Sequence, residues 1–524
     1  MQPEPANPEP DSRQGGLLGT VLRGAGLAGG GYVAAQAINL GVYIALSRLL
    51  TPSEFGQYAA ATVLIGFGLL ITESGMHAAI IQRRDRLEEA QSTAAVATLI
   101  GGVLLALMNL AVAPLLGVIF DSSEVTALAA SASGLIFIHT LSVAPNAILQ
   151  RRFSFVRMFV IGPIEVIVFG AVAIFAAAND IGPWAMLAGQ YAGALMATTL
   201  AWSFARWRPR LALVSFAMWK ELASYGRHVL LSTTIIRFGE QAADTVIVGR
   251  SLGSAALGQY RYAFRIASLP FAVMLAAAAY VIFPAFARIA AERDRLESAF
   301  LRSLRWMATI GIPAGMILIP LGPSLAVLVF GDVWEPAGYA AVAMCAYAGA
   351  SCITSSVVEL LKADGQPSGL TRINIVITVT TAATMIAMIP LGLTAIAAGL
   401  SAGAVAGAAY AVRSAVRRVG IPVRPMMKEI YPPLLASILM AAVVLPLDRY
   451  VLEPGSHGTV QGLLLLAAEG LLAVAVYAVA VSAISPSHPR ELIGLVRSRG
   501  GRSGALGEGA DTDLVEELES TLMD

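Results

Sequence analysis

Long apolar runs separated by short polar segments dominate this chain from residue 26 to residue 484. Each run has about 20 residues, the length that an α-helix needs to cross the hydrocarbon core of a membrane. The pattern therefore predicts about fourteen transmembrane helices. The expected spans are 26–47, 60–82, 91–118, 125–149, 158–178, 181–203, 229–249, 256–285, 303–330, 336–361, 371–391, 393–412, 430–447 and 460–484.

The composition supports an all-α membrane protein. The chain is 57% hydrophobic and 13% charged, whereas a soluble domain is nearer 25% charged. One large soluble core would leave too few polar residues to cover its surface. The net charge of +1 gives no reason to expect a nucleic-acid partner.

The distribution of cations predicts the orientation, because positively charged loops stay on the cytoplasmic side. With the N-terminus inside, most of the 35 lysines and arginines fall in cytoplasmic segments. The largest groups lie in 204–228, 286–302 and 413–429. We therefore expect both termini in the cytoplasm.

A polar segment at 204–228 divides the chain into two halves. The stretch from Ser215 to Gly226 resembles a capped amphipathic helix that lies at the membrane interface. The expected parts are a disordered cytoplasmic tail at 1–25, an N-terminal six-helix bundle at 26–203, a linker helix at 204–228, a C-terminal six-helix bundle at 229–412, a linker with two additional helices at 413–484, and a cytoplasmic tail at 485–524.

An internal repeat relates the two halves. In residues 47–59 and 249–261, Arg48 matches Arg250, and Gly56-Gln57-Tyr58 matches Gly258-Gln259-Tyr260. We interpret both stretches as outer turns that follow the first helix of a half. Six spans lie between them, so the halves share one orientation. Two parallel bundles around a central cavity are an architecture for alternating access.

The stretch SRLLTPSEFGQYAAATVLIGFGLLITESGMHAAIIQRRD, residues 47–85, resembles the opening hairpin of Wzx-type flippases of the polysaccharide transport family. Residues 244–289 resemble the start of that family's second half. The resemblance implies a flippase of the bacterial inner membrane that moves undecaprenyl-diphosphate-linked oligosaccharide to the periplasmic leaflet. It also implies membrane lipids, a polysaccharide polymerase and a chain-length regulator as partners.

Ionisable side chains inside spans are costly, so each is a functional candidate. One group recurs at three- and four-residue spacing on one helix face: Arg237, Glu240, Gln241 and Asp244. Arg261 and Arg265 have the same spacing on the next helix. With an outer turn near Leu252 and Gly253, Asp244 would lie level with Arg261, and Glu240 level with Arg265.

Two interpretations of this group stay open. Arg237, Arg261, Arg265 and Gln241 could bind a diphosphate, because the guanidinium fork suits phosphate oxygens. The carboxylates would then couple transport to an ion gradient. Alternatively, the charges form ion pairs that pin one helical hairpin.

Four further residues have possible roles. Glu165 and Glu73 are intramembrane carboxylates that could carry protons. Pro270, five residues beyond Arg265, is a candidate hinge. Glu469 in the last span could contact a partner or face lipid headgroups.

The sequence carries no P-loop and no metal-ligand constellation, so we expect neither an enzyme nor a cofactor or metal site. Two transport alternatives remain. A multidrug-exporter-like cation antiporter would need an acidic cavity. A lipid II flippase is expected to carry an arginine cluster in its first half, where this chain has none.

Overall fold

The computed structural model describes residues 34–66, 80, 85–152, 155–224, 242–289, 292–365, 367–452 and 454–486. Throughout these ranges the regular elements are helices, in agreement with the apolar pattern. In the first half, residues 34–49 form a helix. It is followed by α2 (Pro52–Ala61), α4 (Leu87–Phe120), α5 (Ser123–Arg151), α6 (Phe155–Ala177) and α7 (Trp184–Ala205).

The second half begins with α9 (Ala243–Ile289), which is two helical segments joined at Gly253. Gly253 has φ 84°, a left-handed conformation that glycine adopts without a steric penalty. The turn predicted near Leu252 and Gly253 is therefore confirmed. The half continues with α10 (Arg293–Met316), α11 (Leu318–Leu325), a π-helical turn (Ala326–Phe330), α12 (Glu335–Ala343), α13 (Cys345–Ala363), α14 (Pro367–Ala387) and α15 (Leu393–Arg418).

The turn between α14 and α15 lies where the sequence predicts it. A short 3₁₀ helix, Ile389–Leu391, precedes Gly392, whose φ is 87°. Two more helices follow, α16 (Val423–Leu447) and α17 (Thr459–Ile484). Arg305 of α10 binds Glu429 of α16 through two contacts of 2.6 and 3.0 Å, which fixes the additional helices to the second half.

Seven of the described helices are long and apolar enough to cross a membrane. Two bent helix pairs add up to two more if each pair crosses as one broken span. One runs from Arg293 to Phe330 with a 46° bend, and the other from Asp332 to Ala363 with a 44° bend. On α4, Ile100 (56%), Leu104 (62%) and Leu107 (57%) are exposed, as expected for side chains that face lipid. The chain is thus a multi-pass membrane protein; the total of about fourteen spans stays a prediction.

The structure corrects one assignment. Gly56-Gln57-Tyr58 and Gly258-Gln259-Tyr260 are not outer turns, because they lie inside α2 and the second segment of α9. The helix α2 begins at Pro52, before the expected span 60–82, because Thr51 and Glu54 form a capping box. The Glu54 N–H donates to Thr51 Oγ1 at 3.3 Å, and the Thr51 N–H donates to the Glu54 carboxylate at 2.8 Å.

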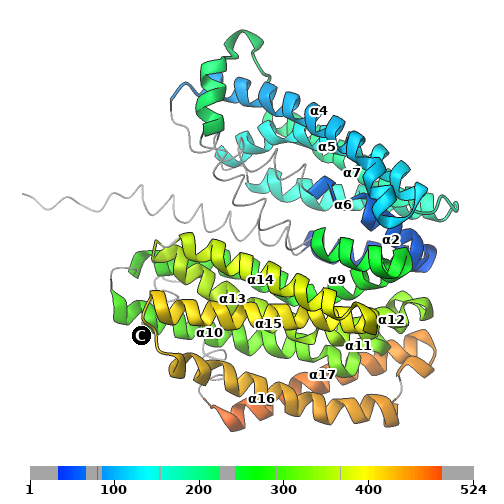
Figure 1. Cartoon of the computed structure of the whole chain (residues 1–524), viewed down its shortest axis with the longest axis vertical. Helices are drawn as coiled ribbons and strands as arrows, with labels where there is room; N and C mark the ends of the chain where they lie inside the picture. The colour runs from blue at the N-terminus through cyan, green and yellow to red at the C-terminus, as the bar shows by residue number, and fades with distance from the viewer. Residues whose placement is uncertain are drawn as a thin grey trace, which may run out of the picture.

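Figure 1 shows how the halves are arranged. The helices α2 and α9 lie side by side between the two halves at one end of the molecule. We call this the repeat end, because it carries Gly56 and Gly258. The segment 206–224 lies at the opposite end of the first half, which we call the linker end.

Candidate functional site

The two repeated segments pack against each other at the repeat end. A Cβ atom on Gly56 would collide with the carbonyl group of Ser254, and one on Gly258 would collide with the carbonyl group of Pro52. Pro52 and Ser254 are themselves equivalent positions of the repeat. The Oγ atoms of Ser53 and Ser254 lie 2.8 Å apart. Ser254 and Gly258 are small residues four positions apart, a spacing that allows such a close backbone approach between membrane helices.

A second pair of contacts joins corresponding regions of the two halves. Arg48, at the end of the first helix, donates to the carbonyl of Leu328 at 2.6 Å, at the end of the third helix of the other half. In the reverse direction, the ring of Phe120 packs where a Cβ atom of Gly249 would lie. In each half, the end of the first helix thus contacts the end of the third helix of the other half.

An aromatic layer lies beside this contact. The ring centroid of Tyr262 is 4.6 Å from that of Phe55 and 3.9 Å from that of Trp334. The Tyr262 hydroxyl donates to the carbonyl of Tyr43 at 2.9 Å, and the Trp334 indole N–H donates to the carbonyl of Ser47 at 2.9 Å. Tyr262 and Trp334 are almost fully buried. The layer joins the halves through large apolar surfaces that exclude water.

Arg265 lies next to this layer and reaches across to the first half. Its guanidinium carbon lies 3.1 Å from the centroid of the Tyr43 ring, which is a cation–π contact. One guanidinium nitrogen donates to Asn39 Oδ1 at 3.3 Å. The Tyr58 side chain interacts electrostatically with Arg265 and forms a hydrogen bond with Gln190 of α7. Arg265, a residue of the second half, thus stands among polar groups of the first half. Within the described residues, only one of the hydrogen bonds that its five donors can form is made, the one to Asn39.

Asp244 and Arg261 form the pair that their spacing predicts. The Arg261 guanidinium lies 3.7 Å from Asp244 Oδ2, with side-chain exposures of 22% and 4%. The other carboxylate oxygen, Oδ1, accepts from the Thr245 N–H at 2.7 Å. This geometry favours the ion pair within one hairpin over direct use of Arg261 on a substrate.

The remaining candidates are scattered. Glu165 lies on α6 against Gly193 of α7 and already takes part in a polar interaction. Pro270 lies in a continuous helical stretch, because the non-helical break in α9 is at Gly253. Four site candidates lie outside the described residues: Glu73, Arg237, Glu240 and Gln241.

A buried carboxylate pair was not predicted. Glu469 of α17 and Asp448, just beyond α16, lie against each other with exposures of 1% and 7%. Ser324 of α11 donates to Asp448 at 3.0 Å. Glu469 therefore does not face lipid headgroups. The sequence did indicate Glu469, because it lies ten residues inside an otherwise apolar helix. Its partner Asp448 comes close only in the folded structure.

Comparison with protein families gives two matches. A family model described as "Polysaccharide biosynthesis protein" matches residues 45–338, which is more than half of the chain. A model described as "Lipid II flippase MurJ" matches residues 229–466. Both matches include α9, and the first also includes α2.

Three curated proteins are similar in sequence. The succinoglycan biosynthesis transport protein ExoT of Rhizobium meliloti is 26% identical over 479 residues, covering 88% of this chain and 92% of ExoT. The teichuronic acid biosynthesis protein TuaB of Bacillus subtilis is 25% identical, covering 55% of this chain and 60% of TuaB. The lipopolysaccharide biosynthesis protein WzxC of Escherichia coli is 24% identical, covering 62% and 64%.

Solved structures share the fold. The lipid II flippase MurJ in an inward closed conformation superposes with a TM-score of 0.72 at 14% identity, covering 89% of this chain and 99% of MurJ. An inward-facing multidrug resistance MATE transporter gives a TM-score of 0.55 at 17% identity, covering 76% and 94%. At these identities the likeness shows the fold alone.

Proposed function

Because the chain belongs to the polysaccharide biosynthesis protein family, we propose that it is a flippase for an undecaprenyl-diphosphate-linked oligosaccharide. It moves this lipid from the cytoplasmic to the periplasmic leaflet by alternating access, and it is a transporter rather than an enzyme. The observation that carries the proposal is the position of Arg265. This arginine lies directly beside a sealed contact between the two halves and reaches from one half to the other.

We assign the repeat end to the periplasm and the linker end to the cytoplasm. Support comes from the cations, since Arg206, Arg208 and Arg210 cluster at the linker end and positive segments stay inside. Both termini are then cytoplasmic, in the inner membrane of a bacterium. The two-bundle division, with additional helices after residue 412, is part of the same proposal.

In this orientation the structure is closed toward the periplasm. The contact between Gly56 and Gly258, with the aromatic layer beside it, has to separate before a headgroup can leave on that side. The diphosphate would bind Arg265, together with Arg237 and Gln241, because the guanidinium fork pairs with phosphate oxygens in a dry site. Opening of the repeat end would then release it outward.

The names of the three relatives refer to succinoglycan, teichuronic acid and lipopolysaccharide. These polymers differ in their sugars, so the common recognition element is the carrier's diphosphate. A polysaccharide polymerase and a chain-length regulator are proposed as downstream partners, because a translocated unit has to be polymerised. Coupling to an ion gradient is proposed through Glu240, Asp244, Glu165 or Glu73.

Deletion of the gene in its own host tests the proposal. We expect a lipid-linked oligosaccharide to accumulate on the cytoplasmic face, where it is protected from enzymes added outside the cell. Extracted lipids would be identified by mass spectrometry, and re-expression should restore export. Unchanged lipid pools would contradict the proposal.

Lipid II is the second candidate substrate, since the MurJ family model matches residues 229–466. The same deletion separates the two, because a lipid II flippase would leave the unmodified peptidoglycan precursor to accumulate and would stop growth. A cation antiporter would change neither lipid and would instead change resistance to amphipathic cations.

A further inference from the structure

A cavity of about 780 Å³ lies at the linker end, away from the contact between the halves. All of its lining comes from α4, from the end of α7 and from the segment that follows α7. Among the described residues, none of the second half contributes. The lining residues are Glu88, Ser92, Trp202, Ser203, Arg206, Trp207, Arg208, Pro209 and Arg210.

The cavity has an excess of positive charge. Arg210 is neutralised by Glu88 at 2.7 Å. Arg206 and Arg208 are exposed and form no ion pair within the described part of the chain. Nor are they needed to cap α7. Arg152 and Arg157 donate to its last carbonyls, those of Ala205 and Phe204, at 2.6 and 3.1 Å. Two guanidinium groups therefore remain for an anion.

Two tryptophan side chains indicate where the cavity lies relative to the membrane surface. Trp202 and Trp207 stack with their ring centroids 5.9 Å apart. The Trp202 indole N–H donates to the Leu141 carbonyl at 2.9 Å, whereas the Trp207 N–H has no partner among the described residues. Tryptophan gathers at the headgroup level of a membrane, where one part of the ring is apolar and the other is wet.

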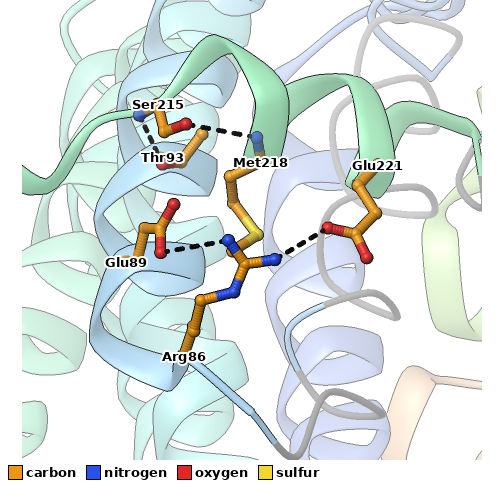
Figure 2. Close-up of polar contacts among 6 residues, drawn as sticks. All are labelled: Arg86, Glu89, Thr93, Ser215, Met218 and Glu221. Carbon is orange, nitrogen blue, oxygen red and sulfur yellow. Dashed lines mark hydrogen bonds and ion pairs between the residues drawn. The ribbon is translucent and has the colours of Figure 1, made fainter.

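The wall of the cavity is held in place by the linker. The Arg210 N–H donates to Ser92 Oγ and the Ser215 N–H donates to Thr93 Oγ1, both at 3.1 Å. Figure 2 shows Ser215 capping the linker helix, residues 216–224, next to Thr93 of α4, with the Met218 side chain pointing from that helix toward Arg86. Met218 is fully buried. The cavity is thus a preformed site.

We propose that this cavity binds the phosphate headgroup of an anionic glycerophospholipid in the cytoplasmic leaflet. Arg206 and Arg208 bind the phosphate, and the tryptophans contact the glycerol and the start of the acyl chains. The lipid is a resident and not the cargo, because a transported headgroup passes between the halves. Figure 1 shows the linker at the edge of the first half, on the far side of α4 from the second half. The choice of leaflet rests on the orientation proposed above; the binding chemistry does not.

Lipid binding to the purified full-length protein tests this site. Delipidated protein in neutral detergent is titrated with phosphatidylglycerol, and bound lipid is counted by native mass spectrometry. The double variant Arg206→Gln/Arg208→Gln should bind roughly 30-fold more weakly, since each arginine near an anionic lipid contributes a factor of about five. The matched control is Arg413→Gln/Arg417→Gln, which removes two exposed arginines from the last turns of α15.

Wild-type affinity in the cavity variant, or an equal loss in the control, overturns the proposal. Equal displacement of the lipid by millimolar inorganic phosphate would make the cavity a site for soluble phosphates instead. Loss of binding to undecaprenyl diphosphate, with phosphatidylglycerol binding retained, would make it a waiting site for cargo. None of these measurements depends on transport, so the flippase proposal can fail or stand separately.

Discussion

Arg265 is the residue on which the transport proposal depends. In the described part of the chain its guanidinium contacts a ring and an amide, and no carboxylate neutralises it. Arg261, four residues earlier, is neutralised by Asp244. Two arginines that the sequence treats as equivalent therefore have different surroundings, and they should respond differently to substitution.

Arg265→Ala should lower export of the polysaccharide by roughly 10- to 100-fold, because it removes charge-assisted bonds to the diphosphate. Arg265→Lys should recover only part of the activity, because lysine keeps the charge but loses the planar fork over Tyr43. Export would be measured in the deletion strain, with protein levels determined by immunoblot. Normal export by Arg265→Ala would remove this residue from the binding site.

Asp244→Ala should destabilise the protein by about 3–5 kcal/mol, because it leaves a partly buried arginine without its partner. The double variant Asp244→Leu/Arg261→Met should recover most of this loss, because replacing a buried pair by apolar residues is often neutral. Thermal unfolding in detergent measures both effects. If the double variant is stable but inactive, the pair also serves transport.

At the scale of elements, hydropathy predicted the helices well because each apolar run has to form its own backbone hydrogen bonds in lipid. The ends were less predictable. The capping box at Thr51 starts α2 before its apolar run. The 46° bend near Met316 depends on how α10 and α11 pack in three dimensions. Among the site residues, the Asp244–Arg261 pair followed from helical spacing and one glycine turn, whereas the contacts of Arg265 with Tyr43 and Asn39 connect distant segments.

The linker helix should stay docked on α4 mainly through Met218. The ion pair between Arg86 and Glu221, at 3.4 Å, is exposed on both sides and contributes little. Met218→Asp should undock the helix, because burying a carboxylate in an apolar site costs several kcal/mol. Limited proteolysis in detergent should then cut the segment faster. Phe216→Asp, at a side chain that is 76% exposed, is the control and should cut at the wild-type rate.

At the scale of the whole molecule, the two repeated stretches contact each other and join the halves. Matching sequence stretches predicted the parallel arrangement, but not that the matched glycines would touch each other. That contact depends on both halves being folded and side by side. It is also the part of the structure that alternating access has to break.

A disulfide across the repeat end should therefore stop transport. Ser53→Cys/Ser254→Cys places two thiols where the hydroxyl oxygens lie 2.8 Å apart, within the range that a disulfide can bridge. In a background with Cys345 and Cys352 replaced by alanine, oxidation should abolish export and a reductant should restore it. Each single cysteine variant is a control. Full export by the cross-linked protein would show that the repeat end does not open.

The length of α4 has a consequence for the membrane around the protein. Its 34 residues extend about 51 Å, well beyond a hydrocarbon layer of about 30 Å. The surplus has to be taken up by inclination of the helix or by projection into the aqueous phase. The connection between the two halves is bonded to one end of α4, so a change in inclination moves that connection with it. Bilayer thickness thereby becomes a physical variable that acts on how the halves meet.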